Sequence, residues 1–236
     1  MHLILIPGLW LDASSWDLVV PPLREAGHRT HALTLPGMEG PAADRTGVTL
    51  RDHVDAVVGV IDSLDPGEGR PVLVGHSGGG AIAHAAVDAR PDRVARVVYV
   101  ASEPKGEGQC INDQLPVVNG EVPLPEWSFF GSEELDGLDS GMRADFRARA
   151  VPAPVGVVRD GQRLSDERRY EVPATVVACE YPSAMLRQWV AQGHPGAREL
   201  GRIRDVEYVD LATGHWPQFS RPAELARVIL ASVDGG

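Results

Sequence analysis

The residues best suited to chemistry form the sequence Gly-His-Ser-Gly-Gly at positions 75–79. This Gly-x-Ser-x-Gly pattern follows an apolar, β-branched run at 72–74 and leads into an alanine-rich segment that favours a helix. Glycines on both sides let the backbone turn sharply, so the hydroxyl of Ser77 is expected to project above a sheet. The amide of Gly78, at the start of the helix, favours a developing negative charge. The pattern therefore predicts a nucleophilic serine with one oxyanion donor.

A serine hydroxyl is a weak nucleophile near neutral pH and needs a base. Of the eight histidines, we assign this role to His215, in the loop after the last predicted strand at 206–211. That loop is expected at the same sheet edge as Ser77, in the chain order serine, acid, histidine. His76 is expected to shape the turn, because its side chain points away from that of its neighbour Ser77. The other six histidines are assigned to the surface or to packing.

The elements that must position these residues alternate along the chain. Apolar runs predict strands at 3–6, 30–35, 72–74, 94–100, 174–179 and 206–211. Helical patterns with capping residues predict helices at 15–26, 49–64, 183–192 and 222–233. This alternation is typical of an α/β fold, in which a mostly parallel sheet is covered by helices on both faces. We expect one such core, made of residues 1–101 and 173–236.

The regular alternation stops between residues 102 and 172. This segment is rich in proline, glycine and acidic residues and contains one convincing helix, at 141–150. It is too long for a simple connection, so we interpret it as a small cap or lid inserted over the site. An aromatic cluster at 127–130 argues against the alternative, a disordered insertion, because disordered segments are poor in aromatic residues.

Composition limits the classes of partner. The 236 residues are 43% hydrophobic, enough for one α/β domain, and the net charge of −11 disfavours binding to nucleic acid or to an anionic membrane. Cys110 and Cys179 have no metal-binding or disulfide-framework spacing, and no histidine pair has metal spacing. The opening apolar run is too short for a signal peptide and has no basic residues before it. We expect a cytoplasmic protein with a small-molecule substrate and neither metal nor cofactor.

These motifs, together with Thr-Gly-His-Trp-Pro at 213–217 and Arg-Pro-Ala-Glu-Leu at 221–225, resemble the α/β-hydrolase superfamily. The opening Ile-Pro-Gly-Leu-Trp at 6–10 is similar to the branch that contains plant methylesterases and hydroxynitrile lyases. Their His-Gly-x-Trp pattern begins with histidine, whereas this chain has Pro7. The resemblance implies the α/β-hydrolase fold and a second oxyanion donor, the amide of Leu9, which does not depend on the side chain.

The acid that would orient His215 departs from the superfamily pattern. Its usual Gly-x-x-Asp turn reads Cys-Glu-Tyr-Pro here, with Pro182 in the aspartate position. Glu180 ends the same strand, and Glu103 follows the strand after the serine turn, near an alternative acid position of some superfamily members. We favour Glu103 as the catalytic acid, with Glu180 as the alternative. Asp210 and a serine–histidine dyad are further alternatives.

The resulting hypothesis is a serine hydrolase that cleaves a carboxylic ester, thioester or lactone through an acyl-enzyme on Ser77. A small and largely apolar substrate is suggested by the aromatic residues expected near the site, which are Trp10, Trp127, Phe129, Phe130 and Trp216. The same aromatic residues can instead form a small core of the cap. The irregular acid position favours a second class, a non-catalytic ligand-binding module of the same fold. A hydroxynitrile lyase is disfavoured, because that family uses a lysine near the histidine and the only lysine here, Lys105, lies in the cap.

Overall fold

A computed structural model describes residues 1–234 and contains a six-stranded sheet in which every neighbouring pair of strands is parallel. The strand order is β2-β1-β3-β4-β7-β8. Parallel sheets are buried on both faces, and the central strands are accordingly continuous apolar runs. The strands are β1 (His2–Ile6), β2 (Arg29–Ala32), β3 (Val72–His76), β4 (Arg96–Val100), β7 (Ala174–Ala178) and β8 (Val206–Asp210).

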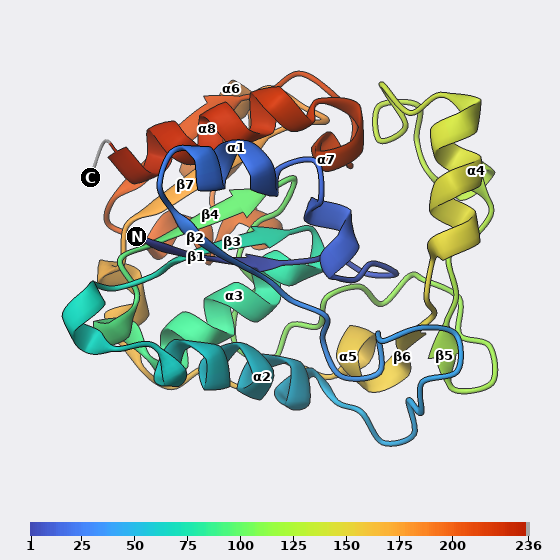
Figure 1. The fold of residues 1–236 in the computed structure, drawn as a ribbon, viewed down its shortest axis with the longest axis horizontal. Helices are drawn as coiled ribbons and strands as arrows, with labels where there is room; N and C mark the ends of the chain where they lie inside the picture. The colour runs from blue at the N-terminus through green and yellow to red at the C-terminus, as the bar shows by residue number, and fades with distance from the viewer. Residues whose placement is uncertain (235–236) are drawn as a thin grey trace.

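Helices cover both faces of this sheet. Helices α1 (Val20–Glu25) and α8 (Pro222–Asp234) lie on one face, and α2 (Leu50–Ser63) and α3 (Gly78–Ala89) lie on the other (Figure 1). Helix α6 (Ser183–Ala191) contributes Leu186 to the same hydrophobic core as α2 and α3. Adjacent residues of β1 point to opposite faces, so Leu3 and Leu5 join the core under α1 and α8 while Ile4 and Ile6 join the other. None of the helices in residues 1–234 is long and apolar enough to cross a membrane.

The local sequence explains where two of the helices begin. Thr49 caps α2 with a reciprocal pair of hydrogen bonds to Asp52, the capping box that the sequence predicts. The helix predicted at 15–26 is instead divided into a 3₁₀ helix at Ala13–Trp16 and the short helix α1. Two prolines, Pro21 and Pro22, stand at the start of α1, where their missing N–H groups cost nothing, and they could not have continued a helix from residue 15.

A long insertion separates β4 from β7. It contains a two-stranded antiparallel sheet, β5 (Glu121–Val122) with β6 (Ala153–Pro154), and the helices α4 (Ser140–Arg149) and α5 (Val155–Arg159). These elements lie together at the end of the main sheet toward which the arrow of β4 points (Figure 1). A third hydrophobic core joins this insertion to the main domain through Trp10 and Trp216. The functional assignment of the insertion as a cap remains a prediction.

Candidate active site

Ser77 occupies the turn between β3 and α3 with a strained backbone. Its φ of 50° and ψ of −123° lie outside the regions that L-residues usually adopt. The neighbouring glycines make this turn possible: a Cβ on Gly75 would lie 2.7 Å from the Cα of Gly80, and one on Gly79 would lie 2.5 Å from the carbonyl oxygen of Pro7. The hydroxyl of Ser77 is thereby presented at the carboxyl edge of the sheet, as the sequence predicts.

His215 lies against this hydroxyl. Its Nε2 is 2.7 Å from Ser77 Oγ, and the carboxylate of Glu180 accepts a hydrogen bond from its Nδ1. The backbone N–H of His215 donates to the carbonyl of Glu134 at 2.8 Å. Burial by itself would raise the pKa of Glu180, but the hydrogen bond from His215 and the charge of its ring outweigh burial, so the pKa of Glu180 is lowered. A serine, a histidine and an ionised carboxylate are thus linked in series.

The carboxylate in this series is not that of Glu103, the acid that we favoured from the sequence. Glu103 instead accepts a hydrogen bond from the hydroxyl of Tyr181, and burial raises the pKa of Glu103. The strand order explains the difference. Strand β7, which leads to Glu180, is the direct neighbour of β8, which leads to His215, whereas β4 and Glu103 lie on the far side of β7.

Asp210, a further candidate for the acid, has a structural role. Its carboxylate accepts hydrogen bonds from the backbone N–H of Ser183 at 2.6 Å and from the hydroxyl of Ser183 at 2.9 Å. Ser183 is the first residue of α6, where backbone N–H groups lack acceptors within the helix. Asp210 therefore joins the end of β8 to the start of α6.

The two residues predicted to supply the oxyanion donors, Leu9 and Gly78, both lie at the Ser77 cavity. A Cβ on Gly78 would be 3.3 Å from the Leu9 side chain, and both residues line the cavity that contains Ser77. Gly78 opens α3, so its N–H has no acceptor within the helix. Within residues 1–234, the N–H of Leu9 donates to no protein acceptor. Both N–H groups are therefore without a protein acceptor in the described chain, and their role as oxyanion donors stays a prediction.

The cavity at Ser77 has a volume of about 190 Å³ and walls of two kinds. Of the residues predicted to contact substrate, Trp10 and Phe129 line it. Its other apolar lining residues include Leu9, Ile111, Leu115 and Phe130, and its polar ones include Glu103, Lys105, Asn112 and Glu134. Lys105, Asn112 and Glu134 are additions that sequence reasoning missed, since they lie in the irregular insertion and belong to no motif.

Two aromatic residues predicted to contact substrate do not line this cavity. Trp216 is only 1% exposed, and its ring packs against those of Trp127 and Phe146 at centroid distances of 6.0 and 5.4 Å. Trp127 also packs edge-to-face on Phe146 at 5.6 Å. The prediction that Trp127 and Trp216 line the site is therefore wrong. Their large rings pack in the core between the insertion and the main domain, which is close to the alternative of a small core within the cap.

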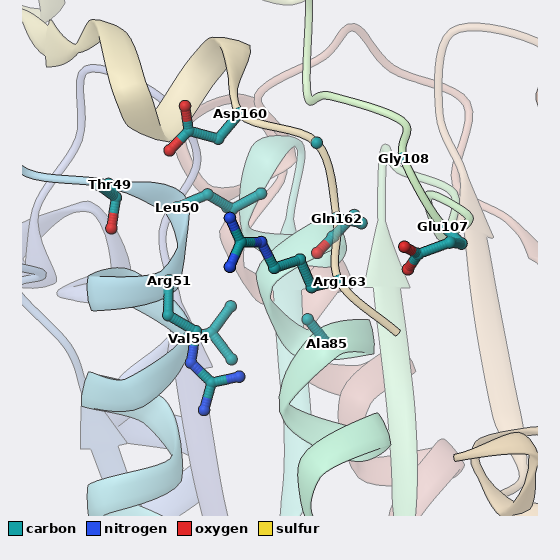
Figure 2. A pocket seen from close by; sticks show the side chains of 11 residues that line it. Thr49, Leu50, Arg51, Val54, Ala85, Glu107, Gly108, Asp160, Gln162 and Arg163 are labelled. Atoms are coloured by element: carbon teal, nitrogen blue, oxygen red, sulfur yellow. The ribbon is translucent and has the colours of Figure 1, made fainter. Parts of the chain in front are cut away.

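A larger cavity, of about 580 Å³, lies between α2, α3 and the segments at 107–108 and 160–163. Figure 2 shows the side chain of Arg163 extending toward Leu50 across this space. The larger cavity shares no lining residue with the Ser77 cavity and contains neither serine nor histidine.

In residues 1–234, no group of three or more histidine, cysteine, aspartate or glutamate side chains is arranged to hold a metal ion. The only serine–histidine pair with hydroxyl-to-ring contact in the described chain is Ser77–His215.

Comparisons with known proteins agree with this fold. The profile described as "Alpha/beta hydrolase family" matches residues 3–228, and the chain therefore belongs to that family. Methylesterase 7 of Arabidopsis thaliana is 25% identical over 262 residues, which cover 98% of this chain and 95% of the relative. Esterase PIR7B of Oryza sativa subsp. japonica is 40% identical over 139 residues, 58% of this chain and 47% of the relative. A crystal structure of an Arabidopsis methylesterase covers 100% of both chains with a TM-score of 0.76 at 17% identity, a likeness of fold.

Proposed function

We propose that this α/β-hydrolase cleaves small carboxylic esters through an acyl-enzyme formed on Ser77. The esterases and methylesterases among its relatives support an ester hydrolase. The single observation that carries the serine mechanism is the distance of 2.7 Å between Ser77 Oγ and His215 Nε2, with a carboxylate on the other ring nitrogen.

The proposed reaction proceeds in two halves. In the first, Ser77 Oγ attacks the ester carbonyl carbon while His215 Nε2 takes the hydroxyl proton, and the N–H groups of Leu9 and Gly78 stabilise the oxyanion. The tetrahedral intermediate collapses, the carbon–oxygen bond to the alcohol breaks, and His215 returns the proton to the departing alcohol. Glu180 keeps the Nδ1 proton in place and stabilises the imidazolium ion. In the second half, water takes the place of the alcohol, and its attack releases the carboxylic acid and restores Ser77.

The cavity suggests the size of the substrate. Its volume of about 190 Å³ is below the roughly 300–1,000 Å³ of typical small-molecule sites. Apolar side chains form one part of the wall, so a short acyl or aryl group fits there, and methyl esters are the first class to test because one relative is named a methylesterase. Lys105 and Asn112 supply polar groups for a hydroxyl, carbonyl or carboxylate of the substrate.

Hydrolysis of p-nitrophenyl acetate and p-nitrophenyl butyrate, followed by absorbance, tests the proposal. We expect turnover by the wild type and a fall in kcat of several orders of magnitude in Ser77→Ala. Ser232→Ala is the matched control, because Ser232 is buried in α8, where its hydroxyl donates to the carbonyl of Val228. An enzyme that is inert on all short acyl chains, or a Ser77→Ala variant as active as wild type, would contradict the proposal.

One observation favours a second candidate, a hydroxynitrile lyase. Although Lys105 belongs to the insertion, it lines the same cavity as Ser77 and His215, so this cavity contains a cation as well as the histidine. Release of cyanide from acetone cyanohydrin tests this activity, and no release at high enzyme concentration would exclude it. The irregular acid position favoured a non-catalytic binding module, and the contact between Glu180 and His215 supports the catalytic proposal instead.

A further inference from the structure

His76, the residue before the nucleophile, is completely buried and has no part in the proposed proton transfers. It ends β3, and its ring reaches the backbone of the loop that carries His215. Its Nε2 lies 2.7 Å from the carbonyl oxygen of His215, and its Nδ1 lies 3.2 Å from the side-chain nitrogen of Gln218, which is also completely buried. Gln218 belongs to α7 (Pro217–Ser220), directly after the His215 loop.

These two contacts define the form of the imidazole. A carbonyl oxygen only accepts hydrogen bonds, so Nε2 of His76 must carry the proton, and Nδ1 then accepts from the amide of Gln218. Burial, followed by the nearby charge of His215, lowers the pKa of His76 to about 3. The ring is therefore neutral at any pH near neutrality and presents a single N–H, held in one direction.

Both backbone polar groups of His215 are thus held by distant parts of the chain. The N–H donates to Glu134 in the insertion, and the carbonyl accepts from His76 at the end of β3. These two hydrogen bonds hold the backbone of His215, and therefore the point from which its ring projects toward Ser77. Since Ser77 directly follows His76, the same short segment carries the nucleophile and fixes its base.

The ring of His76 also borders the loop that carries the second oxyanion donor. A Cβ on Gly8 would lie 2.6 Å from His76 Nδ1 and 3.0 Å from the Cβ of Ser77. The backbone of Gly8 therefore packs directly on the imidazole, one residue before the amide of Leu9. One buried ring contacts the base loop on one side and the oxyanion loop on the other.

We propose that His76, with Gln218 behind it, is a positioning residue that sets the distance between Ser77, the ring of His215 and the Leu9 amide. This inference rests on the proposed function for its kinetic consequences. It assigns His76 no contact with substrate, so its removal slows the chemical step and leaves substrate binding nearly unchanged. Displacement of a catalytic group by about 1 Å can cost about 100-fold in rate.

The test replaces His76 in two ways and compares a matched buried histidine. His76→Phe keeps an aromatic ring but removes the N–H donor, and we expect kcat to fall about 10- to 100-fold with KM changed less than about threefold. His76→Gln keeps an N–H donor and should recover part of this loss. His53→Phe is the control, because His53 is buried in α2 and its Nε2 donates to the carbonyl of Pro36 at 2.8 Å. His53→Phe should lower the melting temperature without lowering kcat.

Gln218→Met tests the chain of contacts from the other end. It should lower kcat in the same direction as His76→Phe, and the double variant should be no slower than His76→Phe alone, because Gln218 acts through His76. Wild-type kcat in His76→Phe, or equal losses in His76→Phe and His53→Phe, would overturn the proposal.

A spectroscopic readout separates this proposal from the proposed function. The proton between His215 Nδ1 and Glu180 should give a downfield ¹H resonance in wild type that shifts or broadens in His76→Phe and not in His53→Phe. An enzyme without esterase activity would refute the proposed function, and the resonance would still test the positioning role. An unchanged resonance in His76→Phe would overturn that role whatever the activity.

Discussion

Replacing Glu180 by glutamine should lower kcat about a thousandfold or more while leaving the fold intact. The carboxylate contacts Nδ1 of His215, and the two side chains are only 11% and 19% exposed, so water screens their attraction weakly. Two unit charges about 4 Å apart attract by about 4 kcal/mol at an effective dielectric constant of about 20. In the proposed mechanism, this attraction is gained when His215 becomes an imidazolium ion during the reaction. At about 1.36 kcal/mol for each tenfold change in rate, its loss corresponds to a factor of about 10³.

Glutamine adds a second effect of the same sign. Its amide can donate to Nδ1, which would favour the tautomer with the proton on Nε2, and that nitrogen could then no longer accept the proton of Ser77. A wrong tautomer of this kind costs about 10⁴ in serine proteases, so the combined loss should lie between about 10³ and 10⁴.

Glu103→Gln provides the comparison, since Glu103 lines the same cavity but bonds to Tyr181. We expect its kcat to stay within about tenfold of wild type, as for a side chain that takes no part in proton transfer. The assay is p-nitrophenyl acetate hydrolysis, with circular dichroism to confirm folding. If Glu103→Gln loses the larger factor, the assignment of the acid to Glu180 is refuted.

Three further predictions concern stability and specificity. Gly79→Ala should fail to fold or melt far below wild type, because its Cβ would lie 2.5 Å from a backbone oxygen. A Cβ at Gly59 in α2 would have no atom within 4 Å, so Gly59→Ala should raise the free energy of unfolding by up to about 1 kcal/mol. Thermal unfolding checks both variants. Burial by itself would raise the pKa of Glu199, but hydrogen bonds from its neighbours, first that of His84, lower this pKa to about 2. The ionised carboxylate therefore stabilises the fold fully above its unfolded pKa of 4.5, and this contribution is lost as the pH falls toward 2. Urea titrations from pH 6 to pH 3 should show less pH dependence of stability in Glu199→Gln than in wild type. Lys105→Met should change KM for esters with a carboxylate more than KM for neutral esters of similar size, and equal changes would show that Lys105 does not contact substrate.

Much of the fold could be predicted from the sequence because each strand and helix has its own local signal. The central strands of the parallel sheet are short apolar runs, and α2 begins with a capping box that spans only the four residues 49–52. The boundary error at 15–26 arose where helical periodicity continued across Pro21 and Pro22, which begin a helix rather than extend one.

The site residues that local sequence specifies could be predicted, whereas those that depend on tertiary packing could not. Ser77 and His215 were predicted because a short motif and the chain order specify them. The choice between Glu103 and Glu180 depended on which strand neighbours β8, and that order is set by tertiary packing. Trp216 was misassigned because an aromatic side chain next to a catalytic loop can face either the cavity or the core, and here it packs into the core.

The most direct test of the account is the site of reaction with a fluorophosphonate probe, found by mass spectrometry of proteolytic peptides. Such probes bond covalently to serines that an adjacent base activates, so the account predicts one modified residue, Ser77, with no labelling in Ser77→Ala and much slower labelling in Glu180→Gln. Modification of a different serine, or full ester turnover by an enzyme that the probe never labels at Ser77, would contradict the central claim.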